Sequence, residues 1–268
     1  MKRKLRVGAL ISGGGTNLQA IIDACEAGRI DADIVFVGSD NPGARGLERA
    51  EKHRIPHFTV DYADIHRGYR TDPKGTALPG DFDLAEILAK QHLFPPDTER
   101  ETLVRFFSTR AAAEAALLES MAERGFDLLV LAGFMRTLTP YFIDRVNTDP
   151  ERPRIMNIHP AILPAFPGVD GYGDTFRYGC KVGGCTVHFI DYGEDSGPII
   201  GQRAFPIAPG DSLDVVKANG LREEWALYPE CIQLYAEDRL RVVRRTSALP
   251  GGGVMTRAVV EISTSGKA

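Results

Sequence analysis

LRVGALISGGGTN occupies residues 5–17 and decides the fold of the chain. The apolar run of residues 5–11 is typical of a buried strand, and Ser12 with the glycines after it is typical of a tight loop. Apolar residues then recur at helical spacing until Gly28, which predicts a helix that ends there. A strand, a glycine loop and a helix in this order predict an α/β fold built on a parallel sheet.

The glycine loop at residues 13–17 directs free backbone N–H groups and the positive end of a helix toward whatever lies above it, which suits a phosphate group. It matches only part of the dinucleotide-binding pattern, because Leu18 stands where that pattern requires Gly or Ala. Asp40 follows the next predicted strand at the spacing of the ribose-binding acid of such sites, and we interpret this spacing as coincidental. The loop alone leaves a plain turn and a phosphate site equally open.

The overall composition is that of a globular protein. The chain has 268 residues, 43% of them hydrophobic, and its net charge of −4 predicts no electrostatic footprint for nucleic acid. The four cysteines lack the spacing of a metal site, so we expect reduced thiols and no bound metal. No apolar run is long enough for a membrane span or a signal peptide. We therefore expect a soluble cytoplasmic protein.

Further strands and helices alternate after the first unit. The expected elements are a strand at residues 33–38, a helix at 42–53 begun by the cap Asn41-Pro42, and a strand at 57–60. Prolines and glycines then break the pattern over residues 61–96 and surround one amphipathic segment at 84–93. We expect a single domain over residues 1–268 with an insertion at about 61–104.

The second half of the chain continues the alternation. The expected elements are a helix from the capping box Thr98-x-x-Glu101 to Arg124, a strand at 127–132, a helix at 140–146, strands at 154–158, 185–190 and 199–207, and a helix from the cap Asp211 to about Ala236. A loop rich in Gly and aromatic residues is expected at 166–184. Gly220 and Pro229 should interrupt or kink the last helix. A short hairpin extension is expected at about 239–262.

RIMNIHPAILP, residues 154–164, contains the candidate catalytic pair. If this segment ends a strand, Asn157 and His159 leave the sheet on the same side, because side chains alternate with period two. Pro160 cannot continue a central strand, so the pair should lie at a fixed strand end. A single histidine at a strand end is more often a hydrogen-bonded structural residue than a catalyst. Both interpretations stay open until a partner is found.

The candidate pair should meet other polar segments, because the carboxyl ends of parallel strands lie along one edge of a sheet. The segments expected at that edge are the glycine loop at 13–17, the turn at 133–138 and the strand end at 157–159. An aspartate from the loop at 191–198 beside His159 would raise the histidine pKa, so that it acts as a general acid near neutrality. The Asn157 amide could donate to a developing oxyanion. This set suits acyl transfer to an amine without a covalent enzyme intermediate.

Six motifs, taken in chain order, carry a resemblance to a known family. They are ISGGGTNLQAI at 11–21, LAGFMR at 131–136, NIHP at 157–160, TVHF at 186–189, DSGPII at 195–200 and EWALYP at 224–229. Together they resemble the phosphoribosylglycinamide formyltransferases of purine synthesis, over about residues 5–60 and 105–243. The resemblance implies a Rossmann-like, mostly parallel twisted sheet with helices on both faces and antiparallel strands toward the C-terminal part.

The resemblance also implies a reaction and its residues. A formyl group would pass from 10-formyltetrahydrofolate, as co-substrate, to the amine of 5-phosphoribosylglycinamide. His159 is similar to the family's general acid/base, Asn157 to its formyl-oxygen donor, and Asp195 to the carboxylate that raises the histidine pKa. Positions similar to the ribonucleotide site are Gly15, Thr16, Asn17, Leu221, Arg222, Glu223 and Glu224. Positions similar to the folate site are Arg110, Met135, Arg136, Thr137, Leu138, Asn157, Asp191, Tyr192, Gly193, Glu194 and Asp195.

Other functions remain open beside this one. A methionyl-tRNA formyltransferase should carry a basic C-terminal domain and a formyltetrahydrofolate deformylase an N-terminal regulatory domain, and we expect neither here. A sugar N-formyltransferase shares the same catalytic set. A folate- or nucleotide-binding protein without turnover would not need a pKa-tuned histidine, and the missing third glycine argues against a dehydrogenase. An exposed helix charge is an equal alternative for Arg110, and a homodimer is one open assembly.

Overall fold

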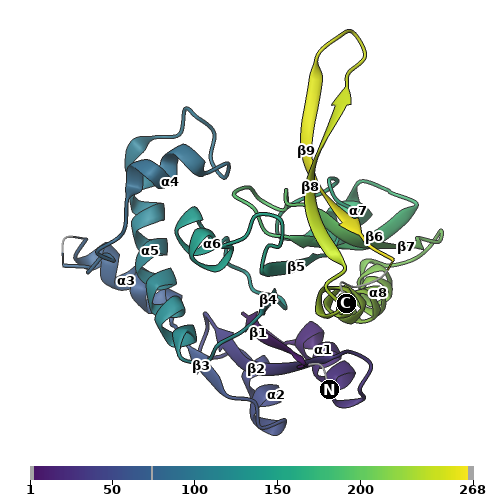
Figure 1. The fold of residues 1–268 in the computed structure, drawn as a ribbon, viewed down its shortest axis with the longest axis horizontal. Helices are drawn as coiled ribbons and strands as arrows, with labels where there is room; N and C mark the ends of the chain where they lie inside the picture. The colour runs from purple at the N-terminus through teal and green to yellow at the C-terminus, as the bar shows by residue number, and fades with distance from the viewer. Residues whose placement is uncertain (1–2, 74, 265–268) are drawn as a thin grey trace.

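The computed structural model describes residues 3–73 and 75–264. Its main sheet has the strand order β3-β2-β1-β4-β5-β6-β7, and β8 with β9 forms a separate two-stranded ribbon (Figure 1). The strands are β1 (Leu5–Ile11), β2 (Ala32–Ser39), β3 (His57–Thr59), β4 (Leu128–Leu131), β5 (Ile155–His159), β6 (Val182–Phe189), β7 (Ile199–Pro206), β8 (Leu240–Ala248) and β9 (Val254–Ile262). The helices are α1 (Thr16–Glu26), α2 (Gly46–Lys52), α3 (Tyr62–Thr71), α4 (Leu84–Lys90), α5 (Arg100–Ala122), α6 (Pro140–Val146), α7 (Gly171–Arg177) and α8 (Leu213–Ala236).

The strand directions confirm the predicted fold class. Strands β1 to β5 are parallel to one another, whereas β6 is antiparallel to both β5 and β7. The sheet is therefore mostly parallel, with its antiparallel part toward the C-terminal end of the chain. Strand β4 pairs with β1 on one side and with β5 on the other, so the loops that follow these three strands open at the same edge.

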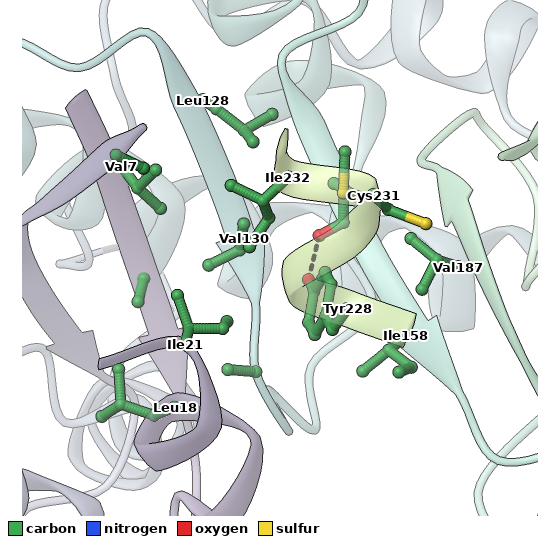
Figure 2. Close-up of a cluster of buried hydrophobic side chains, with 14 of the residues drawn as sticks. Val7, Leu18, Ile21, Leu128, Val130, Ile158, Val187, Tyr228, Cys231 and Ile232 are labelled. Atoms are coloured by element: carbon green, nitrogen blue, oxygen red, sulfur yellow. Dashed lines mark hydrogen bonds between the residues drawn. The ribbon is translucent and has the colours of Figure 1, made fainter. Parts of the chain in front are cut away.

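Hydrophobic layers cover both faces of the sheet. On one face, Ile21 of α1 and Ile232 of α8 pack with Val130 of β4, in the cluster that Figure 2 shows. On the other face, Leu117 of α5 packs with Leu129 of β4. All of these side chains are fully buried. Neighbouring residues of β4 thus serve opposite layers, as the period of a strand requires, and the predicted helices on both faces are confirmed.

Helix α2 begins at Gly46, later than the predicted start at residue 42. The predicted cap Asn41 instead closes a turn, because its Oδ1 accepts a hydrogen bond from the Gly43 N–H at 2.9 Å. The Gly46 N–H donates to the carbonyl of Gly13 at 2.9 Å. A long-range contact with the glycine loop, which no local pattern reports, therefore sets where this helix starts.

Helix α5 does not use the predicted capping box. It begins at Arg100, and the preceding Glu99 makes no side-chain hydrogen bond to the helix. The Thr98 N–H donates to the Pro95 carbonyl at 3.1 Å. Thr98 is therefore part of the turn before the helix, and its spacing from Glu101 has no capping role.

Helix α8 differs from its prediction at its start and in its middle. The cap is Ser212, whose hydroxyl accepts from the Val215 N–H at 3.3 Å, whereas the predicted cap Asp211 accepts from a loop amide outside the helix. The helix runs unbroken through Gly220 and Pro229. Its buried face packs along the sheet, and this packing outweighs the backbone hydrogen bond that proline removes.

The expected insertion at 61–104 contains two helices before α5, where one segment was predicted. Asp61 caps α3 by accepting from the Asp64 N–H at 3.0 Å, and Asp83 caps α4 by accepting from the Ala85 N–H at 2.8 Å. The loop expected at 166–184 likewise contains α7 and the first residues of β6. The ribbon of β8 and β9 extends away from the main sheet (Figure 1). Across the part of the chain described, no helix combines the length and apolarity needed to cross a membrane.

Candidate active site

A cleft of about 260 Å³ opens at the carboxyl edge of β1, β4 and β5. Its lining combines segments that lie far apart in the chain. They are Asn17, Leu131, Gly133 to Leu138, Asn157 to Pro160, Gly168, Val169, Ile190, Asp191, Gly193 to Asp195 and Glu224. The turn after β4, the end of β5 and the loop after β6 therefore meet in one cavity.

The structure brings the predicted histidine and aspartate together. The Nδ1 atom of His159 lies 3.1 Å from Oδ2 of Asp195. Its Nε2 atom lies 2.7 Å from the carbonyl oxygen of Phe166. Carbonyl and carboxylate oxygens only accept hydrogen bonds, so both ring nitrogens can be satisfied at once only when both carry protons. The pocket is therefore built for the imidazolium form of His159.

The pKa of His159 reflects this environment. Burial by itself lowers the pKa, since His159 is only 3% exposed, but the hydrogen bond and negative charge of Asp195 outweigh burial and raise it above the ordinary value. The Phe166 carbonyl acts in the same direction. A raised pKa keeps a proton available on His159 near neutral pH.

Asp195 is held in place from several sides. Its backbone adopts a left-handed conformation with φ of 48°, and its Oδ2 accepts the Gly168 N–H at 2.9 Å. Burial would raise the pKa of this carboxyl, but the hydrogen bond with His159, with help from His188 and the Gly168 N–H, holds the pKa well below its usual range. Asp195 is therefore ionised at neutral pH and faces His159 as a carboxylate.

His188 belongs to the same cluster, and no role for it was predicted. Its Nδ1 lies 2.9 Å from the carbonyl of Phe189, and its Nε2 lies 3.3 Å from the amide nitrogen of Asn157. The same Nε2 lies 3.6 Å from Oδ1 of Asp195, so His188 contacts both the Asn157 amide and the carboxylate. The motif at 186–189 was recognised from the sequence, but pairing of Asn157 with His188 depends on the register between β5 and β6.

Asn17 and Glu224 form a second polar group in the cleft. The Asn17 amide donates to Glu224 at 2.6 Å, and the hydroxyl of Tyr172 donates to the other carboxylate oxygen at 2.7 Å. Burial raises the pKa of Glu224, and these two donors oppose that rise. Asn17 Oδ1 is buried without a hydrogen-bond partner in the described chain, so a donor from a bound molecule could satisfy it. Tyr172 comes from α7, which was predicted as loop.

The glycine loop lies beside this group. Gly15 precedes α1 with φ of 66°, a conformation that favours glycine, and a Cβ there would lie 2.9 Å from Gly46 Cα. The Arg49 guanidinium donates to the Gly14 carbonyl at 2.8 Å, so a side chain of α2 fixes the position of the glycine loop. The first N–H groups of α1 have no partner inside the helix and remain available to a ligand. Thr16 faces a neighbouring groove that Arg222 also lines.

Residues 133–138, predicted for the folate site, line the opposite part of the cleft. The Met135 N–H donates to the Ser12 hydroxyl at 2.7 Å, which joins this turn to the glycine loop. Met135 is 60% exposed. Arg136 forms an ion pair with Asp40, which is 2% exposed, so Asp40 positions this arginine instead of binding a ribose.

Several predicted site residues lie outside the cleft lining. The Arg110 guanidinium stacks over the rings of Tyr62 and Phe106, with 5.6 and 5.2 Å to their centroids. The Tyr192 hydroxyl donates to Asp144. The remaining predicted positions on α8 lie around Glu224: Leu221 is half-buried, Arg222 contacts Asn219, and Glu223 pairs with Arg203.

Comparison with known proteins identifies the family to which this chain belongs. The model of the formyl transferase family matches residues 5–232, so the chain belongs to that family and is a formyltransferase. Phosphoribosylglycinamide formyltransferase from Haemophilus influenzae is 33% identical over 246 residues, which are 92% of this chain and 94% of that protein. Glycinamide ribonucleotide transformylase 1 from Symbiobacterium toebii, a crystal structure, shares 35% identity and a TM-score of 0.69 over 98% of this chain and 95% of that one.

A third relative links the family to a pathway. The trifunctional purine biosynthetic protein adenosine-3 of Drosophila melanogaster is 33% identical over 235 residues, 87% of this chain. The chain spans only 14% of that longer protein. The resemblance to phosphoribosylglycinamide formyltransferases that the six motifs predicted is confirmed by these comparisons.

Proposed function

We propose that the protein transfers the formyl group of 10-formyltetrahydrofolate to the amine of 5-phosphoribosylglycinamide. The observation that carries this proposal is the His159–Asp195 pair at 3.1 Å in a cleft shared with Asn157. A charged imidazolium and a side-chain amide on one wall suit a reaction in which negative charge develops on a carbonyl oxygen. The names of the relatives, phosphoribosylglycinamide formyltransferase and glycinamide ribonucleotide transformylase, describe the same transfer.

In a direct attack by the amine, different cleft residues stabilise the developing charge and transfer the protons. Asn157 donates a hydrogen bond to the formyl oxygen as the tetrahedral intermediate forms, and the His159 imidazolium stabilises the same charge. His159 then passes its Nε2 proton to the departing folate nitrogen as general acid, once this N–H exchanges the Phe166 carbonyl for the substrate. The attacking amine loses one proton as the new amide forms, and the neutral Nε2 accepts it, which restores the imidazolium. Asp195 keeps the ring charged until that step and orients it through Nδ1.

The two ends of the cleft differ in what they can bind. Free amides of the glycine loop suit the ribonucleotide phosphate, and Glu224 with the unpartnered Asn17 Oδ1 suits hydroxyl or amine donors of the same substrate. The turn at 133–138 and the loop at 191–195 suit the folate, since their backbone groups and the apolar Leu138 border the other end. Partners are thus small molecules, and a cytoplasmic location fits the proposed role.

The test is to incubate the protein with 10-formyltetrahydrofolate, with and without 5-phosphoribosylglycinamide, and to follow tetrahydrofolate release together with formylated ribonucleotide. Release that depends on the amine and matches product formation supports the proposal. Release without the amine identifies a deformylase. Release that requires an amino sugar instead identifies a sugar formyltransferase. Folate binding without any release leaves a binding protein and contradicts the proposed transfer.

A further inference from the structure

The region of residues 61–104 contacts the loop that carries Asp195. The backbone N–H of His92, just beyond α4, donates to the carbonyl of Tyr192 at 2.9 Å. The Tyr192 hydroxyl donates to Asp144 of α6 at 2.5 Å, and Lys90 at the end of α4 pairs with the other oxygen of Asp144 at 2.7 Å. These contacts connect α4, α6 and the loop at 191–195 to one another.

Helix α4 is itself held in place by the core. Ile87 of α4 is 4% exposed and belongs to a hydrophobic cluster with Phe107 of α5 and Tyr141 of α6. Just before α4, Asp81 forms an ion pair of 2.6 Å with Arg145 of α6. Because α5 and α6 both pack on the main sheet, α4 is a fixed point relative to the cleft.

The loop, in contrast, depends on support from outside. Its internal hydrogen bonds join Asp191 to Gly193 and Ser196. The Tyr192 side chain packs against the hydrophobic cluster that contains Leu138, and its polar groups bond to His92 and Asp144. Asp195 holds a left-handed backbone, a conformation that an L-residue keeps only when its surroundings stabilise it. Losing the outside contacts should therefore let the loop relax and draw Asp195 away from His159.

We propose, on the basis of the proposed function, that Lys90, His92, Asp144 and Tyr192 form a brace that sets the position of Asp195 against His159. Lys90, Asp144 and Tyr192 are positioning residues in this brace, because none of their side chains lines the cleft. The brace acts on the folate end of the cleft only. Asn17 and Glu224 lie on α1 and α8 in a different core layer, so the ribonucleotide end should not respond to it.

Two variants test the brace without opening a cavity at its centre. Tyr192→Phe removes only the hydroxyl that donates to Asp144, and Lys90→Met removes the charge while keeping most of the apolar stem. The loss of one such hydrogen bond predicts that each variant lowers kcat and raises the KM for 10-formyltetrahydrofolate by roughly three- to tenfold. The KM for 5-phosphoribosylglycinamide should stay within about twofold of wild type.

A second readout needs no substrate. The His159 pKa, measured by NMR titration with the signal assigned from a His159→Ala spectrum, should be raised in the wild type and lower in both variants, because Asp195 moves away. Glu86→Gln is the matched control. Glu86 is an exposed side chain that contacts the same Lys90 amine at 2.5 Å and leaves the contact of Lys90 with Asp144 in place when it is replaced, so all values should stay at wild-type level.

Unchanged His159 pKa and unchanged kinetic constants in Tyr192→Phe and Lys90→Met would overturn the brace. Equal rises in both KM values, with a lower melting temperature, would also overturn it, because they would show that these residues contribute only to the general stability of the fold. A wild type that fails to transfer the formyl group contradicts the proposed function instead. In that case the His159 pKa of the variants still decides the positioning role.

Discussion

The two ends of the cleft are supported in different ways. At the end proposed for the ribonucleotide, Asn17 and Glu224 project from α1 and α8, which pack together in one hydrophobic layer, and their side chains bond directly at 2.6 Å. At the end proposed for the folate, Asp195 belongs to the loop between β6 and β7 and is held directly by His159, His188 and the Gly168 N–H, while the proposed brace reaches the loop through Tyr192. One end takes its geometry from helix packing, and the other takes it from a few polar contacts.

This difference has a consequence for function. Helix packing is distributed over many side chains, so the ribonucleotide end should tolerate single polar changes and lose mainly affinity. The loop end concentrates positioning and proton chemistry in few groups, so a single change there should affect kcat and the pH dependence together. Substitutions at the two ends should therefore separate into different kinetic classes, and the following variants test that separation.

The largest effect is expected for His159→Ala. Loss of the imidazolium removes both the general acid and the positive charge beside the oxyanion, so kcat should fall by about 10²–10⁴-fold. Single-turnover kinetics should assign the loss to the chemical step, and the ribonucleotide Kd from calorimetry should stay near wild type. Turnover close to wild type would remove His159 from the mechanism and with it the contrast between the two ends.

A smaller loss with a changed pH profile is expected for Asp195→Asn. The carboxylate raises the pKa of His159, so a reaction that needs the imidazolium loses activity as the pH rises through that pKa. In the variant the histidine pKa falls, and the alkaline limb of the kcat profile should move to lower pH. At neutral pH, kcat should drop by about 10²-fold. A lower rate with the alkaline limb in its wild-type position would contradict the proposed role of Asp195.

At the other end, Glu224→Gln should change affinity rather than rate. The new amide keeps the size of the side chain, and the Asn17 amide can turn over to accept from it, because Asn17 Oδ1 has no partner in the described structure. We expect the KM for 5-phosphoribosylglycinamide to rise about tenfold, in line with one hydrogen bond to a charged group. The folate KM and the pH profile should not change. A shift of the pH profile would show that the two ends are coupled.

The sequence predicted best what local patterns determine. The strand at 5–11, the helix at 140–146 and the strand end with Asn157 and His159 follow from spacing and turn residues within a few positions. The start of α2 was missed because the Gly46 N–H bonds to Gly13, which only the folded chain brings close. His188 and Tyr172 were missed for the same reason. Sheet register and the packing of α7 decide what they contact.

The smallest effect on activity is expected for Glu114→Gln, the buried carboxylate behind the folate end. Glu114 is fully buried, it accepts the Thr139 N–H at 2.8 Å, and burial raises its pKa to about 7. Because the pKa is raised in the folded state, the protonated carboxyl contributes to the stability of the fold. This contribution is fully present below about pH 4.5, the ordinary pKa of the group, and it is lost as the pH rises through about 7. The shift corresponds to a change on the order of 3 kcal/mol. Gln accepts from the same amide but does not titrate, so the melting temperature of wild type should fall below that of the variant as the pH rises from 5 to 8, with kcat unchanged. Parallel melting curves at all pH values would mean that Glu114 stays ionised in the fold.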